Sequence, residues 1–178
     1  MSRTFGRIRQ IGHVVRNLDE SLDRWGRLGI GPFFRLDHVP LDYFRVGGAD
    51  MAIDLSMAVA FSGEMQFELI QQHNPEPSPY KDHLDRYGEG VHHLCSWTTD
   101  YDADMERWLA QGYKLALNGQ LGGARFSYFR VDFLPDTYME VADLTLWVEV
   151  MKKIQDAAVD WDGRDPVRSM ADLVASLT

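Results

Sequence analysis

"IGHVVRNLDESLDRWGRLG", residues 11–29, and "VHHLCSWTTDYDADMERWLAQG", residues 91–112, follow the same plan. Each begins with an apolar, histidine-containing segment typical of a strand, continues with helical periodicity and ends at a glycine. The second copy is three residues longer. His13 and His93 occupy matching positions, about 80 residues apart. A repeat of this length indicates a duplicated module rather than a solenoid.

The residues after each helical segment predict three further strands, so the order strand–helix–strand–strand–strand occurs twice. In the first half, "DMAIDLSMAVAFSG" (50–63) and "EMQFELIQQ" (64–72) are expected to form a hairpin that turns near Ser62. A proline-rich connector, 74–79, and a short helix over 78–88 join the two halves. The other expected strands are 8–16, 29–39, 90–98, 113–119, 124–133 and 136–144.

These patterns predict an α+β fold with one main domain, residues 1–144. The domain consists of module 1 (about 8–73) and module 2 (about 89–144). Residues 145–178 lie outside the repeat and are expected to form a helical C-terminal extension, whose second helix starts with Asp165 as N-cap. We interpret this extension as a packing or dimerisation element.

The composition narrows the class of protein but not its chemistry. Hydrophobic residues make up 45% and charged residues 25% of the chain, as in ordinary soluble proteins. The net charge of -9 and the lack of clustered Lys and Arg argue against a nucleic-acid partner. A single cysteine, Cys95, excludes an internal disulfide and suits a reducing cytoplasm. The first residues do not resemble a signal peptide, and no apolar run is long enough for a membrane span, so we expect a cytoplasmic protein without a membrane partner.

Two adjacent histidines, His92 and His93, lie in a predicted strand. Neighbouring strand residues point to opposite faces of a sheet, so only one of the two can face a given site. The repeat selects His93, because it stands where His13 stands in the first half. We therefore expect His92 on the opposite face, in packing or a surface hydrogen bond.

Each module also ends in a strand that carries a glutamate between large apolar residues, Glu68 in "QFELI" and Glu140 in "YMEVA". If the apolar neighbours face the core, both glutamates face the other side of the sheet. A carboxylate there is costly unless it is solvated, paired or bound to a metal. Imidazole nitrogen and carboxylate oxygen together suit divalent ions. Any one of these residues alone is more often an ordinary strand residue, but the symmetric set favours a metal site formed by His13, Glu68, His93 and Glu140.

The stretches "IGHVVRNLDESLDRWGRLGIGPF", "FELI", "GEGVHHLCSW" and "YMEVADL" resemble the vicinal oxygen chelate superfamily, and its glyoxalase I and methylmalonyl-CoA epimerase branch most. The resemblance covers about residues 8–144. It implies two βαβββ modules that form an open, cupped mixed sheet around one divalent ion of Zn, Ni, Co, Mn or Fe. The ligand positions of the superfamily fall on His13, Glu68, His93 and Glu140.

The same resemblance implies a metal-dependent isomerase, epimerase or lyase that abstracts a proton next to a carbonyl of an apolar or acyl small molecule, with a metal-chelated enolate intermediate. Glu140 and Glu68 are then the candidate catalytic bases, and a homodimer is expected. One departure stands out: the epimerases carry a further carboxylate at a position near Ser56. Asp54 lies two residues away, and we interpret it as an ordinary strand-edge aspartate.

Strand alternation and aromatic content suggest the substrate contacts Phe33, Trp97, Tyr128 and Tyr138, although plain core packing is the better explanation for at least half of these aromatic residues. Two alternatives to the isomerase stay open: a metal-free binding protein of the same fold, and a ring-cleaving dioxygenase. The remaining histidines, His38, His73, His83 and His92, are interpreted as incidental.

Overall fold

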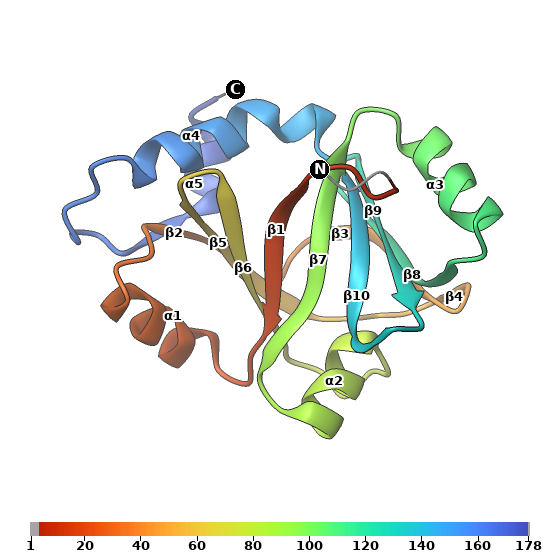
Figure 1. Ribbon diagram of the computed structural model, residues 1–178. Helices are drawn as coiled ribbons and strands as arrows, with labels where there is room; N and C mark the ends of the chain where they lie inside the picture. Colours follow the sequence, from red (N-terminus) through yellow and green to blue (C-terminus); the bar gives the residue numbers. More distant parts are fainter. Residues whose placement is uncertain (1–3, 178) are drawn as a thin grey trace.

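The first strands of the two halves, β1 (Ile8–Val14) and β7 (Gly90–Thr98), lie side by side at the centre of one curved sheet (Figure 1). This arrangement comes from a computed structural model that describes residues 4–177, apart from the side chain of residue 135. The strands follow the order β11-β2-β5-β6-β1-β7-β10-β9-β8-β3-β4. The curved, open sheet with helices on its outer side confirms the predicted fold class.

Module 1 supplies one side of the sheet. Asn17 caps α1 by accepting a hydrogen bond from the backbone N–H of Glu20. Leu18 and Leu22 on α1 are buried against the convex face of the sheet, in a cluster with Leu69. The elements are α1 (Leu18–Arg27), β2 (Phe33–Leu36), β5 (Leu55–Ser62) and β6 (Met65–Gln72). The predicted hairpin near Ser62 is therefore confirmed.

Module 2 supplies the other side in the predicted order. Asp100 caps α3, and Trp108 on this helix is fully buried with Phe129 and Val141 beneath it. The elements are α3 (Tyr101–Ala110), β8 (Lys114–Leu121), β9 (Ala124–Val131) and β10 (Leu134–Asp143). Helix α2 (Pro79–Tyr87) joins the modules, starts directly after its cap Ser78 within the predicted range, and lies at one end of the sheet (Figure 1).

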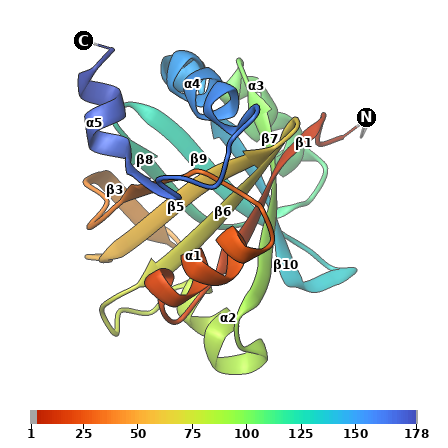
Figure 2. The same ribbon diagram turned by 90° about the vertical axis from the view of Figure 1, so that its left-hand side faces the viewer.

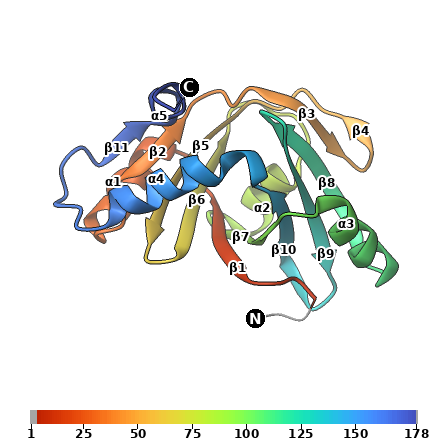
Figure 3. The ribbon, with the colours of Figure 1, turned by 90° about the horizontal axis from the view of Figure 1, so that it is seen from above.

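The segment between β2 and β5 differs from the prediction. It contains two further strands, β3 (Leu41–Val46) and β4 (Ala49–Asp50). Strand β3 pairs with β8 of the other module, and Phe44 is buried in the core beneath it. The repeat did not predict β3, because its partner lies in the other half of the sequence. With β3 of module 1 paired to β8 of module 2, the curved sheet has the shape of a cup (Figure 3).

The C-terminal extension crosses one end of this cup (Figure 3) and then runs along its edge (Figure 2). It contains η1 (Thr145–Trp147), α4 (Val148–Ala158), β11 (Val167–Ser169) and α5 (Met170–Ala175). The predicted start at Asp165 is wrong. Residues 167–169 instead pair with β2, and Ser169 caps α5. Within residues 4–177, no helix is long and apolar enough to cross a membrane.

Candidate functional site

The concave face of the central strands brings polar residues together. On β1, Gln10 and Gly12 lie level with Gln66 and Glu68 on β6. Gly12 also pairs with His93 on β7. Because Gly12 has no side chain, the ring of His93 occupies the space above it. A Cβ at Gly12 would lie only 1.8 Å from Cε1 of His93.

His93 faces two carboxylates from different modules. Its Nε2 lies 3.2 Å from Oε2 of Glu68 and 3.1 Å from Oε2 of Glu140. The His93 ring is fully buried, and both glutamates are nearly so. Neither contact has hydrogen-bond geometry, so Nε2 of His93 and Oε2 of Glu140 are buried polar atoms without hydrogen-bond partners. Such atoms are costly unless a proton or another cation satisfies them.

The electrostatics of this group show the demand for positive charge. Burial alone would lower the pKa of His93, but Glu140, and then Glu68, outweigh it and raise the pKa of His93 to about 9. Burial raises the pKa of Glu68, although His93 opposes the shift. Two buried carboxylates around one imidazole therefore need a cation between them, and a protonated His93 supplies it when no ion is bound.

The donor types of this group suit a divalent metal ion. Two carboxylate oxygens and one imidazole nitrogen are the donors that borderline and hard divalent ions accept, and no cysteine takes part. The two unpartnered atoms, Nε2 of His93 and Oε2 of Glu140, point into the same place. An ion there would replace the proton of His93.

His13, the fourth predicted ligand, lies elsewhere. It is level with Leu69 on β6, on the convex face under α1. Its ring packs edge-on against Trp25, with 4.9 Å between ring centres, and lies 6.5 Å from Phe67. Burial lowers the pKa of His13, the charge of His93 lowers it further, and the carbonyl of Ile11 opposes the shift. The structure thus brings three of the four predicted ligands together.

The expectation that His92 faces away from His93 is wrong. The pairing of β1 with β7 shifts register between Gly12 and His13, which leaves His92 as the extra residue of a β-bulge. Both rings therefore lie against Tyr128, and Nδ1 of His92 is 3.2 Å from Nδ1 of His93. Burial lowers the pKa of His92 well below its usual value, so His92 stays neutral beside the site.

A cavity of about 120 Å³ lies in front of Glu68 and Glu140. Of the four predicted substrate contacts, Trp97 and Tyr128 line this cavity. Tyr138 packs behind it against His92 and Tyr128. Phe33 lies on the convex side, in the core under α1. Which of them contact a substrate stays a prediction.

The prediction from sequence missed several residues of the cavity wall. Gln10 donates a hydrogen bond to Gln66 over 2.8 Å, and Gln66 in turn contacts Sδ of Met151. Both glutamines share strand faces with Gly12 and Glu68, so strand alternation could have found them. Met151 and Trp147 come from the C-terminal extension, where no sequence signal indicated their position.

The strand before β6 places no carboxylate in the cavity. The residues of β5 that face it are Leu55, Met57 and Val59. Ser56 and Asp54 alternate with these and point to the other side, where Asp54 contacts His38. Among the residues that the structure describes, the carboxylates on the wall of this cavity are therefore Glu68 and Glu140 alone.

Comparison with known proteins identifies the family. Residues 9–129 match the Glyoxalase/Bleomycin resistance protein/Dioxygenase superfamily, and the chain belongs to this superfamily, also called the vicinal oxygen chelate superfamily. No protein of curated function is similar enough to match.

Solved structures share the fold. Methylmalonyl-CoA epimerase from Mycobacterium tuberculosis is 17% identical with a TM-score of 0.57, over 80% of this chain and 91% of that one. A Streptomyces coelicolor methylmalonyl-CoA epimerase in complex with 2-nitronate-propionyl-CoA is 20% identical with a TM-score of 0.54, over 77% and 96%. A Bacillus halodurans protein is 17% identical with a TM-score of 0.55, over 77% and 93%.

Proposed function

We propose that the protein is a divalent-metal-dependent isomerase or epimerase that removes a proton next to the carbonyl group of a small acyl compound. The observation that carries this proposal is the meeting of Glu68, His93 and Glu140, in which the two glutamates lie on the wall of a mostly apolar cavity. A structural core would not need two buried carboxylates around one imidazole, because their desolvation is costly.

In this proposal, Glu68, His93 and Glu140 hold the ion. The bound ion would act as a Lewis acid that polarises the substrate carbonyl and so lowers the pKa of the neighbouring C–H. The role of His13 as a fourth ligand stays a prediction, because its ring would have to leave Trp25 to take part.

Glu68 and Glu140 are the proposed bases. They reach the cavity from β6 and β10, on the two sides of His93, so one can remove a proton and the other can return it. A carboxylate that loosens from the ion can accept the proton as a general base. A lyase would share the proton removal and differ only in the bond that breaks next.

The size and lining of the cavity restrict the substrate. About 120 Å³ is below the roughly 300 Å³ at which pockets begin to enclose a whole drug-sized ligand, so the cavity suits a short acyl end while the rest of the molecule lies outside. Trp147, Met151 and Met170 from the C-terminal extension make this end apolar. Acyl thioesters of coenzyme A are the first class to test, because solved structures of similar fold hold methylmalonyl-CoA and a propionyl-CoA analogue.

The test is solvent-deuterium exchange into a panel of acyl-CoA and α-keto compounds, with protein loaded with Co²⁺ or Zn²⁺. We expect exchange at the carbon next to the carbonyl in one class. Glu140→Gln and Glu68→Gln should each slow the exchange by about 100-fold or more, the usual contribution of a general base. Asp50→Asn, an exposed carboxylate on β4, is the matched control. Absence of exchange with every compound would contradict the proposal.

A second candidate is a metal-free binding protein of the same fold. The observation in its favour is that a protonated His93 supplies a positive charge next to both carboxylates without an ion. Such a protein would bind a flat apolar compound in the cavity with the same affinity before and after treatment with a chelator. Loss of binding on metal removal would favour the enzyme.

The proposed homodimer and the domain boundary at residue 144 rest on the resemblance and the repeat. Sedimentation of the full chain tests the first. The second predicts that a chain ending at residue 144 folds, but with an exposed edge at β2, because β11 covers that edge in the full chain.

A further inference from the structure

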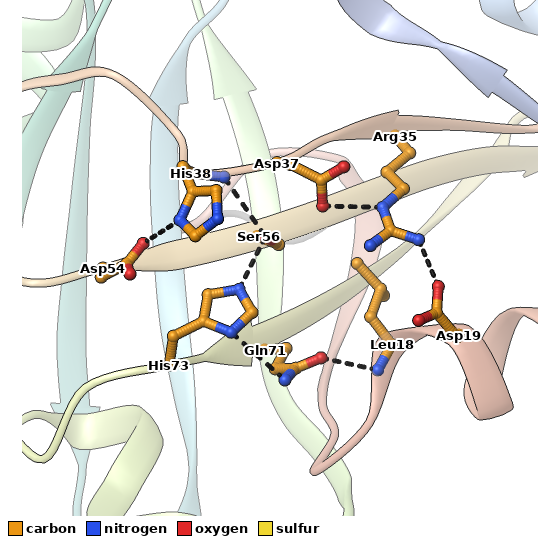
Figure 4. Close-up of polar contacts among 9 residues, drawn as sticks. All are labelled: Leu18, Asp19, Arg35, Asp37, His38, Asp54, Ser56, Gln71 and His73. Atoms are coloured by element: carbon orange, nitrogen blue, oxygen red, sulfur yellow. Dashed lines mark hydrogen bonds and ion pairs between the residues drawn. The ribbon is translucent and has the colours of Figure 1, made fainter.

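We propose a second cation site outside the cup, formed by His38, Asp54 and His73, that takes Zn²⁺ or a similar borderline divalent ion (Figure 4). One ligand-type atom from each of these residues lies within 4.8 Å of the other two. Over residues 4–177, this is the only group of three His, Cys, Asp or Glu side chains that meets this distance. The proposal does not depend on the function of the cup.

Three chain segments meet at this site, and backbone hydrogen bonds fix their positions. His38 lies between β2 and β3, Asp54 directly before β5, and His73 directly after β6. The N–H of His73 donates to the carbonyl of Asp54 over 2.8 Å. On the other side, the N–H of Val39 donates to the carbonyl of Leu55 over 2.7 Å. The three residues are therefore held together by the end of the β5–β6 hairpin.

The backbone of His38 is strained in a way that aims its side chain. Its φ is +47°, in the left-handed region that glycine adopts freely and residues with a Cβ adopt in only a few per cent of cases. Its N–H donates to the buried hydroxyl of Ser56 over 3.2 Å, which holds this conformation. A strained residue that keeps a functional side chain is a reason to look for a role, because a glycine would fit the backbone better.

The side chains already form a polar network (Figure 4). Nδ1 of His38 is 2.8 Å from Oδ1 of Asp54, and the two ring centres of His38 and His73 are 5.1 Å apart. Nε2 of His73 contacts Oγ of Ser56 at 2.7 Å. Its Nδ1 lies 3.3 Å from the side-chain amide of Gln71. Gln71 is itself fixed, because it accepts a hydrogen bond from the N–H of Leu18 over 2.7 Å.

The donor set defines the ion. Two imidazole nitrogens and one carboxylate oxygen suit zinc, cobalt or nickel, and water can fill the remaining positions, since the side chain of His38 is 71% exposed. Ligand atoms on one tetrahedral zinc ion lie about 3.3 Å apart, so no separation in this group has to shorten by more than about 1.5 Å. The exposed rings can make this movement, and one nitrogen of His73 would exchange its present hydrogen bond for the ion.

An ion at this place would stiffen a segment that belongs to the cup. Val39 and Leu41, which follow His38, line the cavity in front of Glu68 and Glu140. The ion would link the residue before them, His38, to both strands at the open end of the β5–β6 hairpin, through Asp54 before β5 and His73 after β6. The site lies on the far side of β5 from the cavity, so the ion itself would not touch a substrate.

The experiment is a calorimetric titration of chelator-treated protein with ZnCl₂, in the Glu140→Gln background that weakens the cup site. We expect this protein to bind one equivalent of zinc. Adding His38→Gly should lower the affinity by at least about 100-fold, since changes around a ligand alone cost about 10- to 100-fold. His73→Ala should do the same.

Asp160→Gly is the matched control for His38→Gly. Asp160 is also exposed and also has a positive φ, +57°, so both substitutions relieve the same kind of backbone strain. Both should keep or raise the melting temperature of the metal-free protein, but only His38→Gly should abolish the rise in melting temperature on adding ZnCl₂. Equal zinc affinity with and without His38→Gly would overturn the proposal.

The two sites can fail separately. If the wild-type chain binds two equivalents and the Glu140→Gln chain binds one, both are supported. If wild type and Glu140→Gln each bind one equivalent that His38→Gly removes, the second site stands and the metal in the cup does not. If wild type binds one equivalent that Glu140→Gln removes and His38→Gly leaves, the second site is refuted.

Discussion

The two modules place matching histidines on opposite faces of the same sheet. In module 2, His93 faces Glu68 and Glu140, and the bulge at His92 brings the ring of His92 to the same side. In module 1, Gly12 stands at the position of His92, and His13 packs under α1 against Trp25. A shift of one residue reverses the face of a strand residue, so equal places in a repeat do not ensure equal places in a site.

The difference also shows how one half makes room for the other. Gly12 contributes no side chain, and the ring of His93 fills the space above it. Module 1 therefore supplies Glu68 and, at Gly12, the space for the ring of His93, while module 2 supplies His93 and Glu140. The duplicated sequence has produced one composite site rather than two equal halves.

The largest expected difference between the modules is in metal affinity. His93→Ala should lower the affinity of the cup for Co²⁺ by more than about 100-fold, because losing a metal ligand lowers the affinity more than losing a residue that only supports a ligand. His13→Ala should change it by less than about 10-fold, because the ring packs against Trp25 and Phe67. Titrations in the His38→Gly background keep the second site out of the measurement. Equal losses would restore the four-ligand symmetry that the repeat predicts.

Gly12→Ala should break the composite site without removing a ligand. Its Cβ would lie 1.8 Å from Cε1 of His93, so the ring must move. We expect a metal affinity about 10- to 100-fold lower and a loss of about 1–3 kcal/mol in unfolding free energy, as for overpacked cores. Gly26→Ala on α1, where a Cβ meets no atom within 4 Å, is the control and should be neutral or stabilising. An unchanged metal affinity in Gly12→Ala would show that His93 can bind the ion without the space above Gly12.

The bulge residue His92 should make the unfolding free energy depend on pH, whereas Gly12, at the matching position of module 1, has no group that titrates. Burial lowers the folded-state pKa of His92 well below 6.5, so its contribution to stability is full above about pH 6.5 and is lost as the pH falls. Between pH 6.5 and 5 the loss is at most about 2 kcal/mol, from 1.36 kcal/mol per pH unit. Urea unfolding of metal-free protein at pH 7, 6 and 5 measures it. His92→Gln should flatten this slope, and the same slope in the variant would contradict the assignment.

The smallest effect concerns two aromatic residues, one from each module. Trp97 of module 2 lines the cavity, whereas Phe33 of module 1 lies under α1. Trp97→Phe should raise KM for the substrate several-fold, while Phe33→Leu should lower the melting temperature and leave KM unchanged. If KM rises in Phe33→Leu but not in Trp97→Phe, the substrate binds on the convex face of the sheet, which contradicts this account.

Much of this fold could be predicted from the repeat. The alternation around Glu68 and Glu140 gave their shared face, and the two predicted helices α1 and α3 begin directly after residues whose side chains cap them, Asn17 and Asp100. These features depend on local sequence, on strand parity and on capping chemistry. The family followed from the same stretches.

The remaining features depend on contacts between distant parts of the chain. Strand β3 forms because β8 of the other module offers it an edge, and residues 167–169 form β11 because β2 does the same. The bulge at His92 depends on the pairing of β7 with β1. The cluster of His38, Asp54 and His73 was missed because these residues share no motif and meet only at the end of the β5–β6 hairpin.

The most direct test of the composite site is the anomalous-scattering map of a crystal grown with Co²⁺. The account predicts a peak in the cup within bonding distance of Nε2 of His93 and of oxygens from Glu68 and Glu140, with the ring of His13 still against Trp25. A cup without a peak, or a peak bound to the ring of His13 as well, would contradict it.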